Sequence, residues 1–156
     1  MVRGLAVVLA LALAACRGGG GGGGEAVRSI DACSLLTAAE IEQHLGKPVR
    51  EGQHSSVSGN AVGCEWLALA QADGVSVTVT ITVFDPDVWA IQKAASGVEP
   101  VAGLGDEALR GWVTQDLLSI RKGNLAVDFA AISVFGERTA TMAAQLELAR
   151  LLVSRL

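Results

Sequence analysis

Three cysteines carry the most reactive side chains of this chain, and they fall into two groups. Cys16 ends an apolar run near the N-terminus, whereas Cys33 and Cys64 lie further along. A cysteine nucleophile needs a base such as histidine, and a redox pair commonly has a Cys-x-x-Cys spacing. The sequence shows neither feature around the two inner cysteines, so we expect neither activity.

The histidines and one pair of aspartates favour structural roles. His44 and His54 are the only histidines, and neither has a metal-ligand spacing to a cysteine or to the other. We expect two surface residues and no metal site. Asp85 and Asp87 flank Pro86, where helix capping accounts for both carboxylates.

Asp106 and Glu107 are adjacent carboxylates in a glycine-bearing turn before an expected strand. Because neighbours on an extended chain point to opposite faces, the two are poorly placed to act together as acid and base. The chain also lacks Gly-x-Ser-x-Gly and His-Glu-x-x-His motifs. We therefore expect a protein that is not an enzyme and needs no cofactor.

The N-terminus has the composition of an export signal. Residues 5–15 are apolar and follow one positive charge, and the run is shorter than the about 20 residues of a membrane-spanning helix. Leu13-Ala14-Ala15-Cys16 resembles the lipobox of bacterial lipoproteins, whose cysteine is lipidated and becomes the first mature residue. The resemblance implies a signal peptide at 1–15; an ordinary export signal or an uncleaved anchor are the alternatives.

A lipid on Cys16 implies attachment to a membrane. Two acyl chains anchor a protein stably, since each buried methylene contributes about 0.8 kcal/mol. Arg17 stands where, by resemblance to the sorting rule of double-membraned bacteria, an Asp favours retention in the inner membrane. We expect a location in the cell envelope, at the outer membrane if the source has two membranes.

Residues 16–30 are predicted to form a flexible tether. Residues 18–24 are consecutive glycines, which have no side chain to bury and lose the most backbone entropy on ordering. A phosphate-binding loop is the sharper interpretation of a glycine run, but it needs a preceding strand and usually a lysine, which are absent here. The folded domain is therefore expected to span 31–156.

Export leaves the two inner cysteines in an oxidising compartment. Cys33 and Cys64 are then expected to form a disulfide, which closes a loop of about 30 residues and contributes roughly 3–4 kcal/mol. Trp66 follows Cys64 on the same face of an expected strand and is predicted to pack over the bridge.

Periodicity and turn signals predict an α+β fold. Thr37-x-x-Glu40 has the form of a capping box, and Gly46 is placed to end that helix. Residues 75–84 alternate between aliphatic and hydroxyl-bearing side chains, as in a strand with one covered face. Other strands are expected at 64–69, 108–113, 117–121 and 125–131, and helices from 86 and over 138–154, the last with Met142, Leu146, Ala149 and Val153 facing the core. Tight turns between strands favour a mainly antiparallel sheet.

The charge pattern argues against a nucleic-acid partner. The formal net charge is −4, and Arg121-Lys122 is the only adjacent basic pair. Binding to a phosphate backbone depends on clustered cations, which this sequence does not provide.

Several motifs occur together in a recognisable order: Asp31-Ala32-Cys33-Ser34-Leu35-Leu36-Thr37, Leu45-Gly46-x-Pro48-Val49, Cys64-x-Trp66, Val101-x-Gly103-Leu104-Gly105-Asp106-Glu107-Ala108 and Arg121-Lys122-Gly123. In this order they resemble bacterial lipoproteins of the DUF3558 type. The resemblance implies an exported α+β domain with the Cys33–Cys64 disulfide. That family has no defined activity, so no catalytic residue is carried over.

These observations predict a membrane-anchored envelope lipoprotein whose domain binds a protein, peptide or small ligand without catalysis. A structural or accessory component of an envelope complex is the alternative, and an enzyme is the third class. Trp112 is a candidate for an exposed binding patch, with a core or edge-strand position as its alternative.

Overall fold

The structure is a computed structural model that describes residues 22–70, 74–133 and 138–156. Its helices are α1 (Gly22–Arg28), the 3-10 helix η1 (Ala32–Ser34), α2 (Ala38–Leu45), α3 (Pro86–Ala94) and α4 (Arg138–Ser154). Its strands are β1 (Gln53–His54), β2 (Val62–Leu67), β3 (Val75–Val83), β4 (Glu99–Pro100), β5 (Glu107–Arg110), β6 (Leu117–Lys122) and β7 (Leu125–Ser133). The predicted signal peptide and Cys16 lie outside the described residues.

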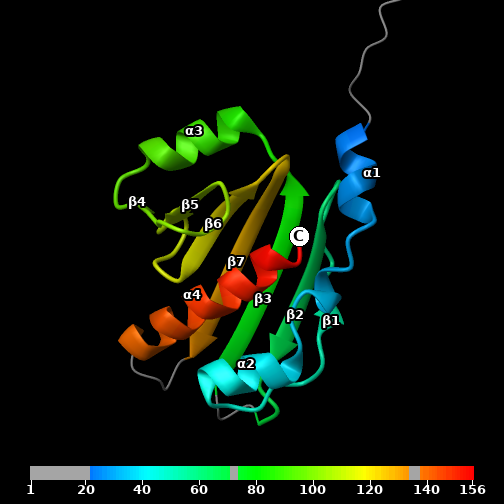
Figure 1. The fold of residues 1–156 in the computed structure, drawn as a ribbon, viewed down its shortest axis with the longest axis vertical. Helices are drawn as coiled ribbons and strands as arrows, with labels where there is room; N and C mark the ends of the chain where they lie inside the picture. Colours follow the sequence, from blue (N-terminus) through cyan, green and yellow to red (C-terminus); the bar gives the residue numbers. More distant parts are fainter. Residues whose placement is uncertain (1–21, 71–73, 134–137) are drawn as a thin grey trace, which may run out of the picture.

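All of these strands belong to one sheet, in the order β1-β2-β3-β7-β6-β5-β4 (Figure 1). Every neighbouring pair is antiparallel. The predicted α+β fold with a mainly antiparallel sheet is therefore confirmed. The two edge strands, β1 and β4, are each only two residues long.

The central strand β3 has the predicted alternation. Val75, Val77, Val79 and Ile81 are buried, while the Ser and Thr residues between them are half-buried. The register pairs Val79 with Phe129 of β7 and continues the apolar row to Leu118 of β6. We call this side the core face and the side bearing the threonines the outer face.

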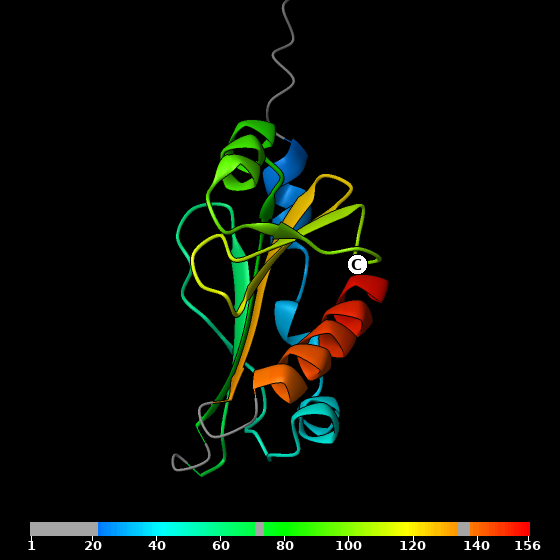
Figure 2. The ribbon, with the colours of Figure 1, turned by 90° about the vertical axis from the view of Figure 1, so that its left-hand side faces the viewer.

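Helices cover the two faces unequally. Figure 2 shows α2 and α4 on the core face, whereas α3 lies on the opposite side near one end of the sheet. Much of the outer face is therefore left without a covering helix.

Helix α2 begins and ends as predicted. Thr37 Oγ1 accepts a hydrogen bond from the Glu40 backbone N–H at 3.2 Å, and Glu40 Oε2 accepts one from the Thr37 backbone N–H at 2.9 Å. Gly46 follows the helix with φ of 68°, a left-handed conformation that glycine adopts without strain.

The prediction of a flexible tether over 16–30 is wrong from residue 22 onward. Residues 22–28 form α1, which packs against β3, and Val27 is completely buried. Arg28 donates a hydrogen bond from Nη2 to Asn60 Oδ1 at 2.7 Å. Burial of Val27 and this contact stabilise a helix that three leading glycines disfavour. The folded domain therefore begins by residue 22.

Helix α4 has the predicted bounds, but the face that it buries against the core differs in part from the predicted one. Ala149 and Val153 are buried as expected, whereas Met142 and Leu146 are only half-buried. Leu148, Leu152 and Gln145 take the inner positions instead. Gln145 is polar, so periodicity of apolar residues does not find it.

The strands after α3 are confirmed, with one shortened. The predicted strand over 108–113 ends at Arg110, because Gly111 turns the chain with φ of 91°. Trp112 is half-buried in the connection that follows β5. It therefore occupies neither the core position nor the edge-strand position that were its alternatives. The segment between α2 and β2 contains the short strand β1.

Within the described ranges, no helix has both the length and the apolar composition needed to cross a membrane.

Candidate functional site: a cavity beneath α3

Helix α3 starts with the predicted cap. Asp85 Oδ1 accepts hydrogen bonds from the backbone N–H groups of Asp87 and Val88, at 2.9 and 3.2 Å. Pro86 occupies the first turn, where its missing N–H costs nothing. The capping role expected of Asp85 is confirmed, whereas Asp87 contributes its backbone N–H to this cap and not its carboxylate. The helix ends at Ala94.

Trp89 and Glu107 hold α3 on the outer face. Trp89 is buried, and its Nε1–H donates to Glu107 Oε2 at 2.8 Å. Lys93 Nζ donates to the other carboxylate oxygen. The hydrogen bond from Lys93, followed by that from Trp89, lowers the pKa of Glu107 below its usual value. This carboxylate therefore stays ionised and anchors the helix.

Asp106 and Glu107 do not act as a pair. Asp106 Oδ2 accepts a hydrogen bond from the Gly123 backbone N–H at 2.7 Å and closes the turn between β6 and β7. Glu107 instead bonds to α3. The two carboxylates thus have separate structural roles, in agreement with the sequence.

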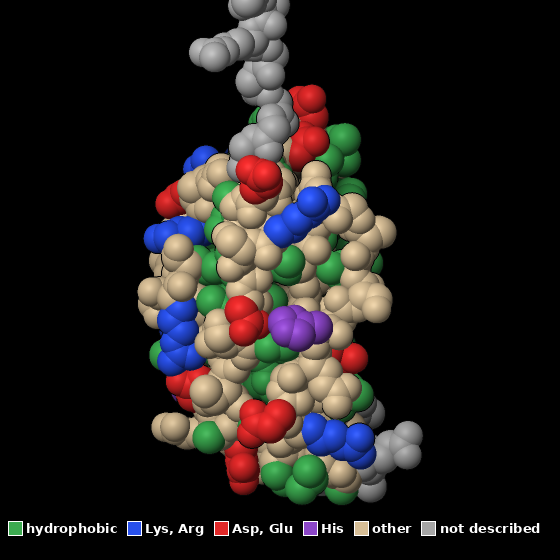
Figure 3. Space-filling view, turned by 90° about the vertical axis from the view of Figure 1, so that its right-hand side faces the viewer, with side chains coloured by type: hydrophobic (Ala, Val, Ile, Leu, Met, Phe, Trp, Pro, Cys, Tyr) green, Lys and Arg blue, Asp and Glu red, His purple; other side chains and the backbone are tan. Residues whose placement is uncertain are grey.

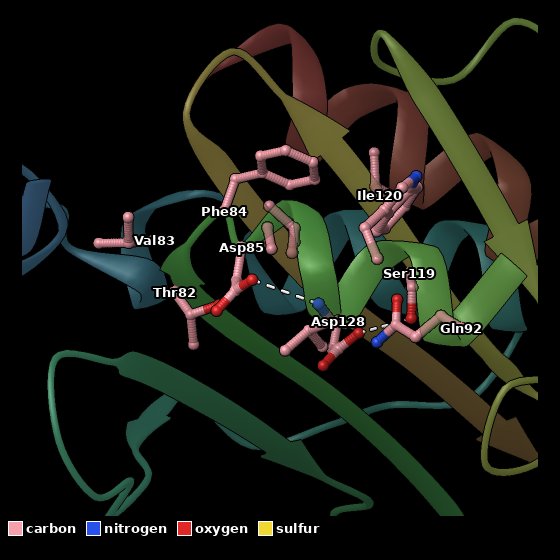
Figure 4. Close-up of a pocket in the computed structure, with 12 residues that line it drawn as sticks. Thr82, Val83, Phe84, Asp85, Gln92, Ser119, Ile120 and Asp128 are labelled. Carbon is pink, nitrogen blue, oxygen red and sulfur yellow. Dashed lines mark hydrogen bonds between the residues drawn. The ribbon is translucent and has the colours of Figure 1, made fainter.

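A cavity of about 250 Å³ lies between α3 and the outer face of β3, β6 and β7 (Figure 4). Its apolar lining includes the side chains of Phe84, Val88 and Trp89. Phe84 and Trp89 meet edge to face, with ring centroids 5.9 Å apart. The cavity is slightly smaller than a typical drug-binding pocket of roughly 300–1,000 Å³, so a small molecule fits it better than a peptide does.

The polar groups of the cavity come from both layers. Ser119 of β6 donates from Oγ to Asp128 Oδ1 of β7 at 2.7 Å. Gln92 of α3 is 8% exposed, and its Oε1 has no hydrogen-bond partner. Figure 4 shows the side chains of Gln92, Ser119 and Asp128 converging on the same space.

Burial raises the pKa of Asp128 above its ordinary value, and the hydrogen bond from Ser119 opposes that effect only in part. Among the described residues, Ser119 is the one side chain that donates a hydrogen bond to this carboxylate. An unpaired buried oxygen costs roughly 1–3 kcal/mol, so Gln92 Oε1 also gains from a donor. Both groups accept hydrogen bonds, which selects an occupant that donates them.

The charge of the cavity points the same way. Its charged lining residues among those described are Asp85 and Asp128, both acidic. The nearby cation Lys93 is already paired with Glu107, and Arg121 lies over the Phe84 ring at 5.4 Å. A small cationic group is therefore favoured over an anion.

In the described part of the chain, no lysine or histidine is hydrogen-bonded to Ser119. Ser119 and Lys122 have a Ser-x-x-Lys spacing, but both lie on β6, where residues three apart point to opposite faces. Asp128 is the only titratable partner with a hydrogen bond to Ser119 among the described residues. His44 lies on α2 and His54 on β1, far along the sheet order from β6.

Sequence reasoning did not find this site. Gln92, Ser119 and Asp128 belong to three separate elements and share no motif. The one available signal was Asp128, a charged residue inside an otherwise apolar strand. It lies on the outer face, which was expected to be polar, and so did not stand out.

A second hollow of about 350 Å³ lies at the end of the β2–β3 hairpin. Arg50 is its one charged lining residue among those described, and none of its lining residues carries a buried, unpaired polar atom. It gives less reason to expect a specific ligand.

The structure brings Cys33 and Cys64 into bonding distance, with Sγ atoms 2.02 Å apart. Trp66 is 1% exposed and lies beside Cys64, since a methyl group added to Gly52 would come within 2.7 Å of both Cys64 Sγ and Trp66 Nε1. No histidine is close to these cysteines along the sequence, but the fold brings one beside them. His54 Nδ1 lies 3.7 Å from Cys33 Sγ, because β1 pairs with β2.

Comparisons with protein-family models, curated proteins and solved structures gave no match. The resemblance to lipoproteins of the DUF3558 type stays a prediction from the sequence motifs.

Proposed function

We propose that this chain is an envelope lipoprotein, anchored through a lipid on Cys16, whose domain binds a small amine in the cavity beneath α3. The observation that carries the ligand assignment is the unpaired, buried Oε1 of Gln92 facing the same cavity as Asp128. Among the described residues, Ser119 has one titratable hydrogen-bond partner, Asp128, and in this proposal that carboxylate binds the amine.

The ligand is expected to combine an ammonium end with a short apolar body. The ammonium group donates hydrogen bonds to Asp128 and to Gln92 Oε1, and its charge compensates that of the carboxylate. The apolar body packs against Val88 and the aromatic rings of Phe84 and Trp89. A cation near an aromatic face gains roughly 0.5–2 kcal/mol.

The anchor places this end of the domain towards the membrane. Figures 1 and 2 show α1 beginning at the end of the sheet that carries α3. Six Cα–Cα steps separate Cys16 from Gly22, which limits the distance between them to about 22 Å. A lipid on Cys16 therefore holds the cavity close to the headgroup region.

Butylamine is a suitable probe, and 1-butanol is its neutral counterpart. An amide-resolved NMR titration of the mature domain is expected to show butylamine shifting signals of Gln92, Ser119 and Asp128. Affinity should rise with pH as Asp128 ionises, because the ammonium group binds the charged carboxylate and burial has raised its pKa.

Two variants make the assignment specific. Asp128→Asn keeps an acceptor for Ser119 but removes the charge, and we expect butylamine affinity to fall about tenfold or more, as for loss of a charged hydrogen bond. Asp87→Asn removes an exposed carboxylate of α3 and should have no such effect. Equal shifts with 1-butanol, or unchanged butylamine binding by Asp128→Asn, would refute the amine site.

A further inference from the structure

Three elements meet at the inner cysteines. Cys33 lies in η1, Cys64 in β2, and His54 of β1 is the direct cross-strand partner of Cys64 on the same face. Asp31 caps η1, accepting a hydrogen bond at Oδ1 from the Cys33 backbone N–H at 3.0 Å. The fold thus brings Asp31, Cys33 and His54 into one cluster, and Cys64 is joined to it through its bond to Cys33.

The side-chain distances suit a metal ion. Cys33 Sγ and His54 Nδ1 are 3.7 Å apart, and His54 Nε2 lies 3.8 Å from Asp31 Oδ1. One ligand atom from each of these three residues lies within 4.8 Å of the others. Tetrahedral zinc with bonds of about 2.0–2.3 Å separates its ligand atoms by roughly 3.3–3.8 Å. One zinc ion binds a single nitrogen of His54, so either this ring or the Asp31 side chain must shift to bring both residues onto the ion. Cys64 Sγ, which is 2.02 Å from Cys33 Sγ in the disulfide, must also move away from it after reduction.

We propose that Asp31, Cys33, His54 and Cys64 form a zinc site in the reduced protein, and that the Cys33–Cys64 disulfide and the bound metal exclude one another. Two thiolates, one imidazole nitrogen and one carboxylate oxygen complete four-coordinate zinc. In the disulfide both sulfurs are bonded to each other, so no thiolate is present to bind the ion.

The chemistry balances with a dithiol as the reductant. Its two thiols give two electrons and two protons to the Cys33–Cys64 bond, which breaks to form two cysteine thiols, while the reductant becomes a disulfide. Zinc binding then displaces one proton from each cysteine into solvent. An oxidant of disulfide class reverses the process and releases the ion.

The exposure of the ligands supplies an entry path. Cys64 is completely buried, Cys33 is half-buried, and the side chains of His54 and Asp31 are 72% and 60% exposed. The ion therefore has one inner ligand and reaches the others from the surface. On the side of the molecule formed by α1, η1 and β1, Figure 3 shows a histidine beside an acidic side chain, with basic groups scattered rather than clustered.

Cobalt(II) is the probe, because thiolate ligands give it a charge-transfer band in the near ultraviolet. The mature protein is reduced with a phosphine, which leaves no competing thiol, and titrated anaerobically. We expect the band to saturate at one cobalt per chain, and zinc to displace the cobalt. The oxidised protein should give no band.

His54→Ala should weaken cobalt binding at least tenfold, since even second-sphere partners of metal ligands contribute 10–100-fold. His44→Ala is the matched control, because His44 lies on α2, outside the cluster, and binding should be unchanged. The double variant Cys33→Ser/Cys64→Ser should show no charge-transfer band.

The second measurement follows reoxidation. Zinc should slow the loss of free thiols, counted by alkylation and mass spectrometry, at least tenfold in the wild type and less in His54→Ala. The proposal is overturned if the reduced wild type gives no band, or if His54→Ala and His44→Ala bind cobalt equally. Equal cobalt binding by the two histidine variants is also the result expected if reduction unfolds the chain, because the two histidines are then equivalent.

Discussion

Arg155, one residue after the end of α4, binds both carboxylate oxygens of Glu40 in the first turn of α2. Its Nη1 lies 2.9 Å from Oε2, and Nη2 donates to Oε1. The same Nη1 also donates to the Leu35 carbonyl oxygen at 2.7 Å. The C-terminal end of the chain is thereby tied to the capping box near its other end.

This ion pair predicts a pH dependence of stability. The hydrogen bond from Arg155, and then that from the Thr37 backbone, lowers the pKa of Glu40 to about 2 from a usual value of 4.5. A group whose pKa falls on folding stabilises the protein above the unfolded value and loses that contribution as pH falls towards the folded one. Glu40→Gln should therefore reduce the free energy of unfolding by about 1–2 kcal/mol at pH 7, and the difference should shrink between pH 4.5 and about pH 2.

Glu147→Gln is the control for that experiment. Glu147 pairs with Arg150 on the exposed surface of α4, and such pairs contribute roughly 0.5 kcal/mol or less. Urea denaturation of both variants across pH measures the two effects. A loss in Glu40→Gln no larger than in Glu147→Gln would contradict the assigned role.

The packing of α1 predicts that Val27→Ala destabilises the domain. Val27 is completely buried, so its truncation should cost roughly 1–3 kcal/mol. Val113→Ala is the matched control, since Val113 is 70% exposed and the same substitution there should change stability by less than about 0.5 kcal/mol. Equal unfolding midpoints for the two variants would mean that α1 does not stabilise the domain and that the tether extends to residue 30 as predicted.

Gly52 has a structural role that a single methyl group can test. An added Cβ would approach Cys64 Sγ and the Trp66 ring to less than 3 Å. Gly52→Ala should therefore lower the free energy of unfolding by roughly 1–3 kcal/mol, as overpacking does. Ser58→Ala, at an exposed position in the segment after β1, should be close to neutral. Thermal melts that coincide would show that the loop moves aside at no cost.

The disulfide predicts sensitivity to reductant. Removing the constraint on a loop of about 30 residues should cost roughly 2–4 kcal/mol. Denaturation of the mature protein with and without a phosphine, in metal-free buffer, measures this directly. Identical midpoints in the two conditions would argue against a stabilising bridge between Cys33 and Cys64.

The proposed anchor predicts the fate of Cys16→Ser. With no sulfur to acylate, the variant should move from the membrane fraction to the soluble fraction, and its intact mass should lack fatty acid. A wild-type protein whose intact mass begins at Met1 and carries no lipid would rule out the anchor.

Local signals in the sequence were sufficient for much of the fold. The capping box of Thr37 and Glu40, the stop at Gly46 and the alternation of β3 each depend on residues within one or two turns of chain. Helix α1 was missed for the opposite reason. Its glycines disfavour a helix, and the contacts of Val27 and Arg28 that stabilise it come from segments more than 30 residues away.

The candidate sites depend on contacts that no local pattern encodes. Gln92 meets Ser119 and Asp128 only because α3 folds back over the outer face. His54 reaches Cys33 only through the pairing of β1 with β2. In both cases the sequence contained the residues, and the sheet order brought them together.

The short length of the edge strands β1 and β4 affects how copies of this protein can associate when they are close together. A sheet that ends in long strands presents rows of free N–H and C=O groups, on which a second molecule can add its own strand. Here the rows at both margins are two residues long, which is too short a template for stable pairing. Many copies can therefore share one surface without joining edge to edge into a growing aggregate.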